Sequence, residues 1–127
     1  MAELSGVKLT LAQSDADRAV EIVRLGYSYT LTCSDVECQR NIAFDVCIDV
    51  LGHDLLRDDT LARSLDTHIV ECGGNSGQPI EIQRSLVVGQ SLLDEDIGTD
   101  EIKLRVRARN DAGDEIAQTS GIVRGRF

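Results

Sequence analysis

The chain has 127 residues, 42% of them hydrophobic, and a net charge of −9 at neutral pH. This length suits a single domain, and the hydrophobic fraction is sufficient for a packed core that needs neither disulfides nor metal to fold. The negative charge argues against binding to nucleic acid or to anionic membrane surfaces, because both recruit basic proteins.

The sequence gives no sign of export or of membrane insertion. The first residues lack the basic region followed by an apolar run that marks a secretory signal. Nowhere does the chain approach the roughly 18 consecutive apolar residues of a membrane span. We therefore expect a soluble protein, which by default is cytoplasmic.

The first third of the chain contains two segments that alternate as strands do. Val7–Ala12 is expected to open the fold, and Tyr27–Cys33 follows with a regular period of two. The apolar face of the second segment, expected in the core, consists of Tyr27, Tyr29, Leu31 and Cys33. Between these segments, Asp15–Leu25 fits two structures. Ser14 could cap a short helix that ends before Gly26, or the same residues could form a strand.

The middle of the chain contains three further strand candidates. Ile42–Leu51 is the best of them, and its apolar face consists of Ile42, Phe44, Val46, Ile48 and Val50. Its opposite face carries Asp45, Cys47 and Asp49. Leu61–Cys72 is a weaker candidate with a break near Asp66, and Ile80–Val88 is a good one.

The clearest strand is Glu101–Asn110, in which apolar and basic residues alternate strictly. The apolar face consists of Ile102, Leu104, Val106 and Ala108, and the basic face of Lys103, Arg105, Arg107 and Arg109. A helix would distribute these basic side chains around its circumference, so the pattern indicates a strand. Residues 110–114 are typical of a hairpin turn, and Glu115–Val123 is expected to return as the next strand.

Together these segments predict an all-β fold, an antiparallel β-sandwich of seven or eight strands with an immunoglobulin-like arrangement. At most one short helix is expected, near residues 15–25, and residues 1–127 are expected to form one domain. The residues predicted for the core are Phe44, Val46, Ile48, Ile102, Leu104 and Val106.

The four cysteines are Cys33, Cys38, Cys47 and Cys72. In the absence of a visible export signal, free thiols in a reducing compartment are the first expectation. One or two disulfides are an alternative, and a metal site is another. The cysteine spacing lacks the close Cys-x-x-Cys pairs that are typical of zinc modules.

Acidic residues predict one candidate metal site. Five carboxylates lie within residues 94–101, and Asp94, Asp96 and Asp100 are the candidate ligands for calcium. Calcium binds six to eight oxygen atoms, which acidic loops at one end of a sandwich can supply. The spacing does not follow the EF-hand pattern, so the hypothesis rests on analogy with other sandwich domains. Solvated acidic turns are the alternative interpretation.

The basic face of Glu101–Asn110 predicts a second candidate site. Arg105, Arg107 and Arg109 could bind a phosphate or contact an acidic patch on a partner protein. Alternatively, an immunoglobulin-like strand order would place Asp45 and Asp49 beside these arginines, forming exposed ion pairs of modest energy. We favour the ion pairs.

The segment Cys72-Gly-Gly-Asn-Ser-Gly-Gln-Pro79 resembles the nucleophile loop of chymotrypsin-like serine proteases, Cys-x-Gly-Asp-Ser-Gly-Gly-Pro. The resemblance implies that Ser76 would be the nucleophile, beside backbone N–H groups that hold an oxyanion. It covers eight residues, with Asn75 for the family's Asp and Gln78 for a Gly. The family also needs about twice this length and an upstream histidine segment that His53 and His68 do not reproduce. We interpret the resemblance as coincidental and the segment as a loop.

The function expected from the sequence is therefore non-catalytic, without a cofactor. We expect a structural or protein-interaction module that binds another protein or its own copies. The alternative is a calcium-binding module that uses the acidic loops.

Overall fold

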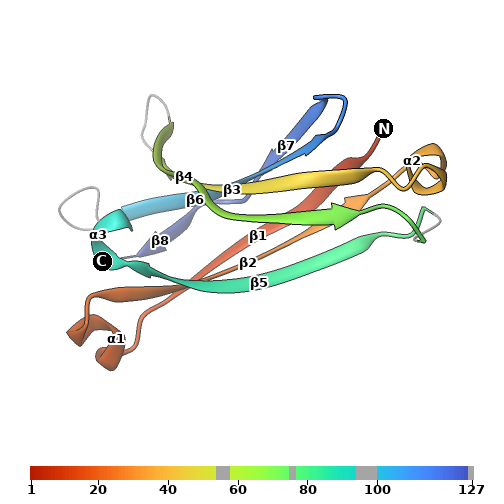
Figure 1. Ribbon diagram of the computed structural model, residues 1–127. Coiled ribbons are helices and arrows are strands. Elements are labelled where there is room, and N and C mark those ends of the chain that lie inside the picture. Colours follow the sequence, from red (N-terminus) through yellow and green to blue (C-terminus); the bar gives the residue numbers. More distant parts are fainter. Residues whose placement is uncertain (54–57, 75–76, 94–99, 126–127) are drawn as a thin grey trace.

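The computed structural model describes residues 1–53, 58–74, 77–93 and 100–125 (Figure 1). Eight strands in these residues form two antiparallel sheets. The first sheet has the order β1 (Glu3–Ala12), β2 (Ile22–Thr32) and β5 (Ile80–Gly89). The second has the order β4 (Asp58–Glu71), β3 (Ala43–His53), β6 (Asp100–Asn110) and β7 (Glu115–Thr119), with β8 (Val123–Gly125) also paired to β6. The all-β, antiparallel prediction is confirmed.

The two sheets contribute to one hydrophobic core. Residues from β1, β2 and β5 pack with residues from β3, β4 and β6 in a single buried cluster. All six predicted core residues, Phe44, Val46, Ile48, Ile102, Leu104 and Val106, are completely buried. Tyr27 and Tyr29 are buried as well, as the alternation in their strand predicts. With few aromatic residues in the chain, aliphatic side chains fill most of this core.

Within the described part of the chain, three short helices connect the strands: α1 (Asp15–Ala19), α2 (Asp35–Gln39) and α3 (Gln90–Leu93). The prediction of at most one helix is therefore wrong. The ambiguous segment Asp15–Leu25 contains both predicted structures, a helix followed by the start of β2. Helices α1 and α2 both begin with a capping box. Ser14 and Ser34 accept the backbone N–H groups of Asp17 and Glu37, and those carboxylates accept the serine N–H groups.

Two predicted strands differ from the observed ones. Glu115–Val123 is two strands, β7 and β8, because Ser120 interrupts the ladder. Its hydroxyl accepts the backbone N–H of Leu104 at 2.9 Å, where a continuing strand would offer a carbonyl. Strand β4 is continuous, and the predicted break near Asp66 is a bulge. The pairing with β3 shifts register there, and Ser64 adopts a φ of 53°.

Among the described residues, no helix has the length and apolar character needed to cross a membrane.

Candidate functional site

Strand β5 is the longest regular edge in the described part of the fold. It pairs with β2 from Ile80↔Leu31 to Gly89↔Ile22 without a register shift. No strand among the described residues pairs with its other side, which lies at the border of the three-stranded sheet (Figure 1). An unpaired strand presents a row of backbone N–H and C=O groups that another chain can pair with.

The other edges are interrupted or short. Strand β1 has a bulge between Ser5 and Lys8, where Gly6 adopts a φ of 60°. The pairing of β4 with β3 shifts register twice, and β7 and β8 have five and three residues. Bulges and short strands are the usual means by which a protein keeps its sheet edges from pairing with another chain. Of the edge strands in the described ranges, β5 alone lacks both of these features.

The side chains of β5 that point toward the second sheet are incompletely covered. Ile80, Ile82 and Leu86 are partly buried against the core, and only Val88 is fully buried. The reason is that β5 and β4, the facing edges of the two sheets, do not pair with each other. The border between them, here called the seam, therefore combines free backbone groups with partly exposed apolar side chains.

A polar cluster spans the seam and consists of Tyr27, Tyr29, Asp66, His68 and Arg84, here called the seam cluster. The Tyr27 hydroxyl donates to Asp66 Oδ2 at 2.5 Å, and Arg84 Nε donates to the same oxygen at 3.0 Å. The Tyr29 hydroxyl is hydrogen-bonded to His68 Nε2. The rings of Tyr27, Tyr29 and His68 stack, with centroids 5.8–6.4 Å apart. These contacts join β2, β4 and β5 across the gap between the sheets.

Burial shifts the pKa values of the seam cluster. Burial and the hydrogen bond to Asp66 raise the pKa of Tyr27, and burial raises the pKa of Tyr29. Burial, assisted by the charge of Arg84, lowers the pKa of His68. Burial acts to raise the pKa of Asp66, but the hydrogen bonds from Tyr27 and Arg84 outweigh it and lower this pKa. At neutral pH the cluster therefore holds neutral rings and one ion pair.

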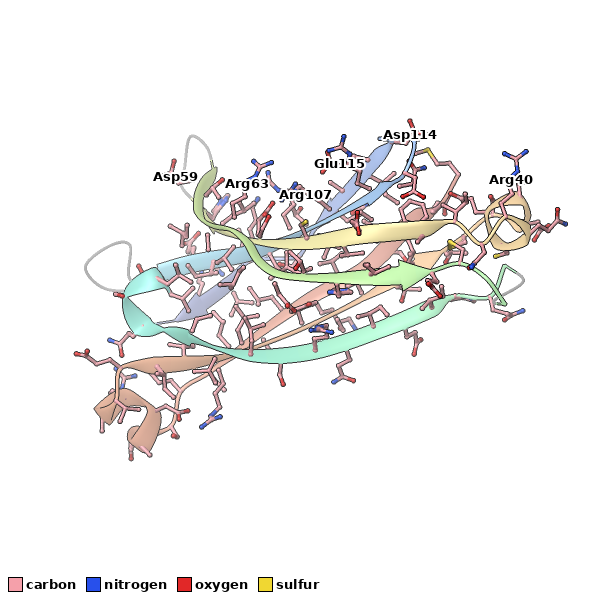
Figure 2. All side chains as sticks on the ribbon, in the orientation of Figure 1. Arg40, Asp59, Arg63, Arg107, Asp114 and Glu115 are labelled. Atoms are coloured by element: carbon pink, nitrogen blue, oxygen red, sulfur yellow. A yellow bond between two sulfur atoms is a disulfide. The ribbon has the colours of Figure 1, made fainter. Side chains whose placement is uncertain are left out.

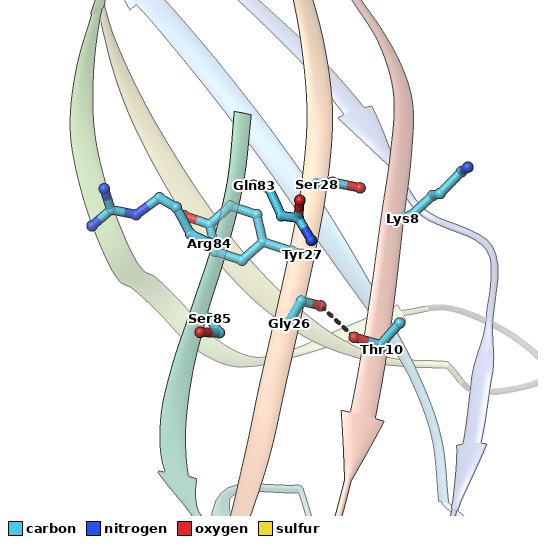
Figure 3. Close-up of a pocket in the computed structure, with 8 residues that line it drawn as sticks. All are labelled: Lys8, Thr10, Gly26, Tyr27, Ser28, Gln83, Arg84 and Ser85. Atoms are coloured by element: carbon cyan, nitrogen blue, oxygen red, sulfur yellow. Dashed lines mark hydrogen bonds between the residues drawn. The ribbon is translucent and has the colours of Figure 1, made fainter. Parts of the chain in front are cut away.

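The outer face of the three-stranded sheet is hollowed at Gly26 (Figure 3). Thr10 lies beside this glycine and donates from Oγ1 to its carbonyl at 3.3 Å. The hollow has a volume of 520 Å³, and short polar side chains such as Ser28 and Ser85 line it with Gln83. Any residue larger than glycine at position 26 would bring its Cβ within 2.7 Å of Thr10 Oγ1. The hollow reaches β5, so the candidate edge borders a polar, weakly concave surface.

The predicted pairing of the basic strand is confirmed. Strand β6 lies beside β3, with Asp45 opposite Arg109 and Asp49 opposite Arg105. Asp49 is 0% exposed and accepts from Arg105 Nε at 2.9 Å, from Arg107 at 2.7 and 3.0 Å, and from the Ser64 backbone. The expected ladder of exposed pairs is therefore wrong at Asp49, which the bulge in β4 covers. Among the described residues, Asp45 and Arg109 form no ion pair despite their register.

The candidate interaction surface of Arg105, Arg107 and Arg109 is thus partly engaged within the protein. Arg107 also contacts Glu115 at 3.4 Å, and its side chain is only 16% exposed. Figure 2 shows Arg107 and Glu115 on the outer side of the five-stranded sheet. Arg109 remains exposed. A partner would have to compete with Asp49 for two of the three arginines.

Most of the candidate calcium site lies outside the described residues. Asp94 and Asp96 belong to residues 94–99, which the structure does not describe. Asp100 begins β6, and its side chain is buried. In the described ranges, no three His, Cys, Asp or Glu side chains are grouped as metal ligands would be. The calcium hypothesis stays a prediction.

The protease-like segment is described only in part, because Asn75 and Ser76 lie outside the described residues. Gly73 donates its backbone N–H to Asn41 Oδ1 at 3.0 Å, and Gly77 donates to Cys38 Sγ at 3.4 Å. His68, one of the two histidines, belongs to the seam cluster.

Two of the cysteines differ from the expectation of free thiols. Cys33 and Cys72 form a disulfide, and both are buried, whereas Cys38 and Cys47 are free and half-buried. Cys33 directly follows β2 and Cys72 directly follows β4, so the disulfide links the two sheets at one end. The first expectation is wrong for this pair and holds for the other two.

Sequence reasoning missed the seam cluster, although one signal was present. In β5 the inward positions are Ile80, Ile82, Arg84, Leu86 and Val88, and a single charge interrupts an apolar row. A charge at a core-facing position requires a partner or access to water. The partner is Asp66 on β4, which lies 18 residues before Arg84 in the sequence. Sequence periodicity does not identify such long-range pairs.

Comparison with known proteins adds little. No family model matches the chain, and no curated protein matches it. Among solved structures, the putative ApaA protein from Bordetella pertussis is 9% identical with a TM-score of 0.43, covering 98% of this chain and 91% of that one. The structural genomics target SoR45 is 10% identical with a TM-score of 0.43, covering 97% of this chain and 84% of that one. Likeness at this level carries no argument about function.

Proposed function

We propose that the chain is a non-catalytic interaction module, an immunoglobulin-like β-sandwich that binds an extended segment of another protein along β5. The observation that carries this proposal is the β5 edge. It is ten residues long, it keeps one register throughout, and it has neither of the features that interrupt or shorten the other edges. A long edge of one register offers a regular row of backbone groups with which an extended chain can pair.

The seam supports the same function. A strand added to β5 would satisfy the free backbone groups and would cover Ile80, Ile82 and Leu86 from the open side. Main-chain hydrogen bonds would provide affinity, and the alternating side chains of the added strand would contact the seam and the polar outer face. Main-chain hydrogen bonds and side-chain contacts are therefore both available to an added strand at this one site.

The strand order supports the immunoglobulin-like arrangement. The first, second and fifth strands share one sheet, and the third, sixth and seventh lie side by side in the other. Immunoglobulin-like sandwiches have the same division, with strands A, B and E in one sheet and strands C, F and G in the other. The disulfide Cys33–Cys72 also joins the two sheets, but it follows β2 and β4, whereas the disulfide of antibody domains joins strands B and F.

Selection of a random peptide library against the intact, isotope-labelled chain tests this function. We expect the recovered peptides to be extended and to alternate apolar with polar residues. Their binding should shift and protect the backbone amides of residues 80–89. Double substitution of the outward-facing Gln83→Lys and Ser85→Lys should abolish binding, because edge lysines oppose strand pairing. Ser28→Lys on the central strand β2 is the matched control. Peptides that bind elsewhere on the molecule would refute the proposal.

A further inference from the structure

The centre of the β5 edge carries a single charge, Arg84. It occupies an inward position between Ile82 and Leu86, and its Nε donates to Asp66 at 3.0 Å. Its side chain is nevertheless 46% exposed, against 20% for that of Asp66. The positive end of this ion pair therefore lies closer to solvent than the negative end. An approaching strand would meet a cation at the middle of an otherwise apolar row.

This arginine opposes pairing between two copies of the chain. In an antiparallel β5–β5 pair centred on Arg84, the two arginines would be directly opposite. If one strand is shifted by two residues in either direction, the two arginines become diagonal neighbours about 7–8 Å apart. Each copy also carries a net charge of −9, which adds long-range repulsion. A charge that points inward at a sheet edge is a known means of preventing self-association. The β5 edge therefore favours a partner of different sequence over a second copy of this chain.

The same charge specifies what that chain carries. We infer that β5 selects an extended segment with a carboxylate opposite Arg84 and aliphatic side chains two residues to either side. This inference rests on the proposed function. A guanidinium has five N–H donors, and the one on Nε already serves Asp66, so the exposed outer donors are suited to a second carboxylate. The flanking aliphatic side chains would cover Ile82 and Leu86, which the fold leaves partly exposed.

Two defined peptides test the selection. Each is blocked at both ends, has the length of β5 and alternates Val with Thr, and the central residue on the Val side is Asp in one and Lys in the other. Each peptide is titrated into the protein, and binding is monitored through the amide signals of residues 80–89. We expect the Asp peptide to bind about tenfold more tightly, since opposite charges across a strand pair attract and like charges repel. An Asp peptide with alternate backbone nitrogens methylated should not bind.

Charge-reversed variants assign the preference to Arg84. Arg84→Glu combined with Asp66→Arg keeps an ion pair across the seam and should invert the preference toward the Lys peptide. Arg84→Gln, which removes the charge without reversing it, should abolish the preference and leave both peptides bound. Arg63→Gln, on the neighbouring edge strand β4, is the matched control and should leave the preference unchanged. Circular dichroism of each variant verifies that it is folded.

The outcomes separate this inference from the function on which it rests. Equal binding of the two peptides at residues 80–89 would overturn the selection of an acidic residue and leave the edge as a docking site. Failure of both peptides to bind at millimolar concentration would overturn both. Concentration-dependent dimers that protect residues 80–89 would show that a second copy occupies the edge, and would overturn the inference about the partner.

Discussion

Asp49 shows how one covered carboxylate can organise a charged surface. It lies on the side of β3 that faces away from the core, where exposed residues are usual, and yet it is completely buried. The bulge in β4 brings the Ser64 N–H to Asp49 Oδ1 at 2.9 Å, while Arg105 and Arg107 close over Oδ2. The carboxylate thus fixes a bulge and two arginines in one arrangement.

Replacing Asp49 should be costly for this reason. Asp49→Asn would leave two arginines without their compensating charge, and we expect a loss of about 3 kcal/mol in the free energy of unfolding. Asp45→Asn, four residues away on the same strand face, is the matched control and should cost less than about 0.5 kcal/mol. Urea denaturation of the two variants measures the difference. Equal effects would show that Asp49 forms no special interaction.

The pH dependence of stability gives a second measurement on Asp49. Burial acts to raise its pKa, but the hydrogen bonds from Arg107, Ser64 and Arg105 outweigh burial and lower it from 3.8 to about 2. A lowered carboxyl pKa stabilises the fold above the unfolded value, and the stabilisation disappears as pH falls through 3.8 toward 2. The contribution is about 2 kcal/mol. Asp49→Asn should lack this acid-dependent loss.

His68 should make the fold sensitive to mild acid. Burial and Arg84 lower its pKa below 6.5, whereas Asp66 opposes this effect. A histidine with a lowered pKa binds a proton in the unfolded chain first, so stability is greatest above about pH 6.5 and falls as pH decreases. We expect a lower urea midpoint near pH 5.5 than near pH 7.5. In His68→Phe this difference should shrink, and an NMR titration of His68 with an ordinary pKa would contradict the prediction.

At the scale of elements, period-two alternation was sufficient to predict the strands of the core. It identified β3 and β6 with their buried faces, and the expected immunoglobulin-like strand order then placed Asp45 and Asp49 among the arginines of β6. Alternation does not reveal short helices, because four or five residues are fixed by their caps and not by periodicity. The Ser34-x-x-Glu37 capping box was a readable signal for α2. The seam cluster depends on contacts between β4 and β5, which local patterns do not encode.

Strand β3 lies between β4 and β6, so its inward side chains should dominate core stability. Phe44→Ala removes a completely buried ring and should cost about 3–5 kcal/mol. Ile69→Ala is the matched control, since Ile69 on β4 is 66% exposed and should lose little. Thermal melting of both variants measures the contrast. Similar melting temperatures would mean that the face assignment of β3 is wrong.

The disulfide joins the ends of β2 and β4 and should contribute strongly to stability. Its cysteines are 39 residues apart, and closing a loop of this length in the unfolded chain corresponds to about 4 kcal/mol. The double variant Cys33→Ala, Cys72→Ala should therefore have a free energy of unfolding lower by about 4 kcal/mol. Cys47→Ser leaves the disulfide in place and serves as the control. Labelling of all four thiols in the denatured chain without a reductant would show that the disulfide does not form.

At the scale of the whole molecule, charge is unevenly distributed. The chain carries −9 overall, yet the outer face of β6 is basic and the β5 edge has a cation at its centre. Composition alone determines the sign of the total charge, and it led to the expectation that the chain does not bind nucleic acid. It did not predict where the positive side chains gather, since that depends on which strands pair. Recognition of an acidic segment would therefore depend on short-range contacts with these basic positions, because the net charge of the molecule repels such a segment at long range.

The net negative charge of the chain also determines which control a test of the calcium hypothesis needs. Any divalent cation screens a net charge of −9, so a small rise in melting temperature with calcium would not indicate a site. Magnesium at equal concentration is therefore the control, because it screens equally but demands octahedral geometry. We expect equal melting temperatures in the two ions after treatment with a chelator. At a calcium concentration 100 times its Kd, a true site would add about 2.7 kcal/mol to the free energy of unfolding. For a domain of this size, that corresponds to a rise of several degrees in melting temperature. A calcium-specific rise of that order, lost on replacing Asp94, Asp96 and Asp100 with Asn, would favour the calcium-binding module over the interaction module.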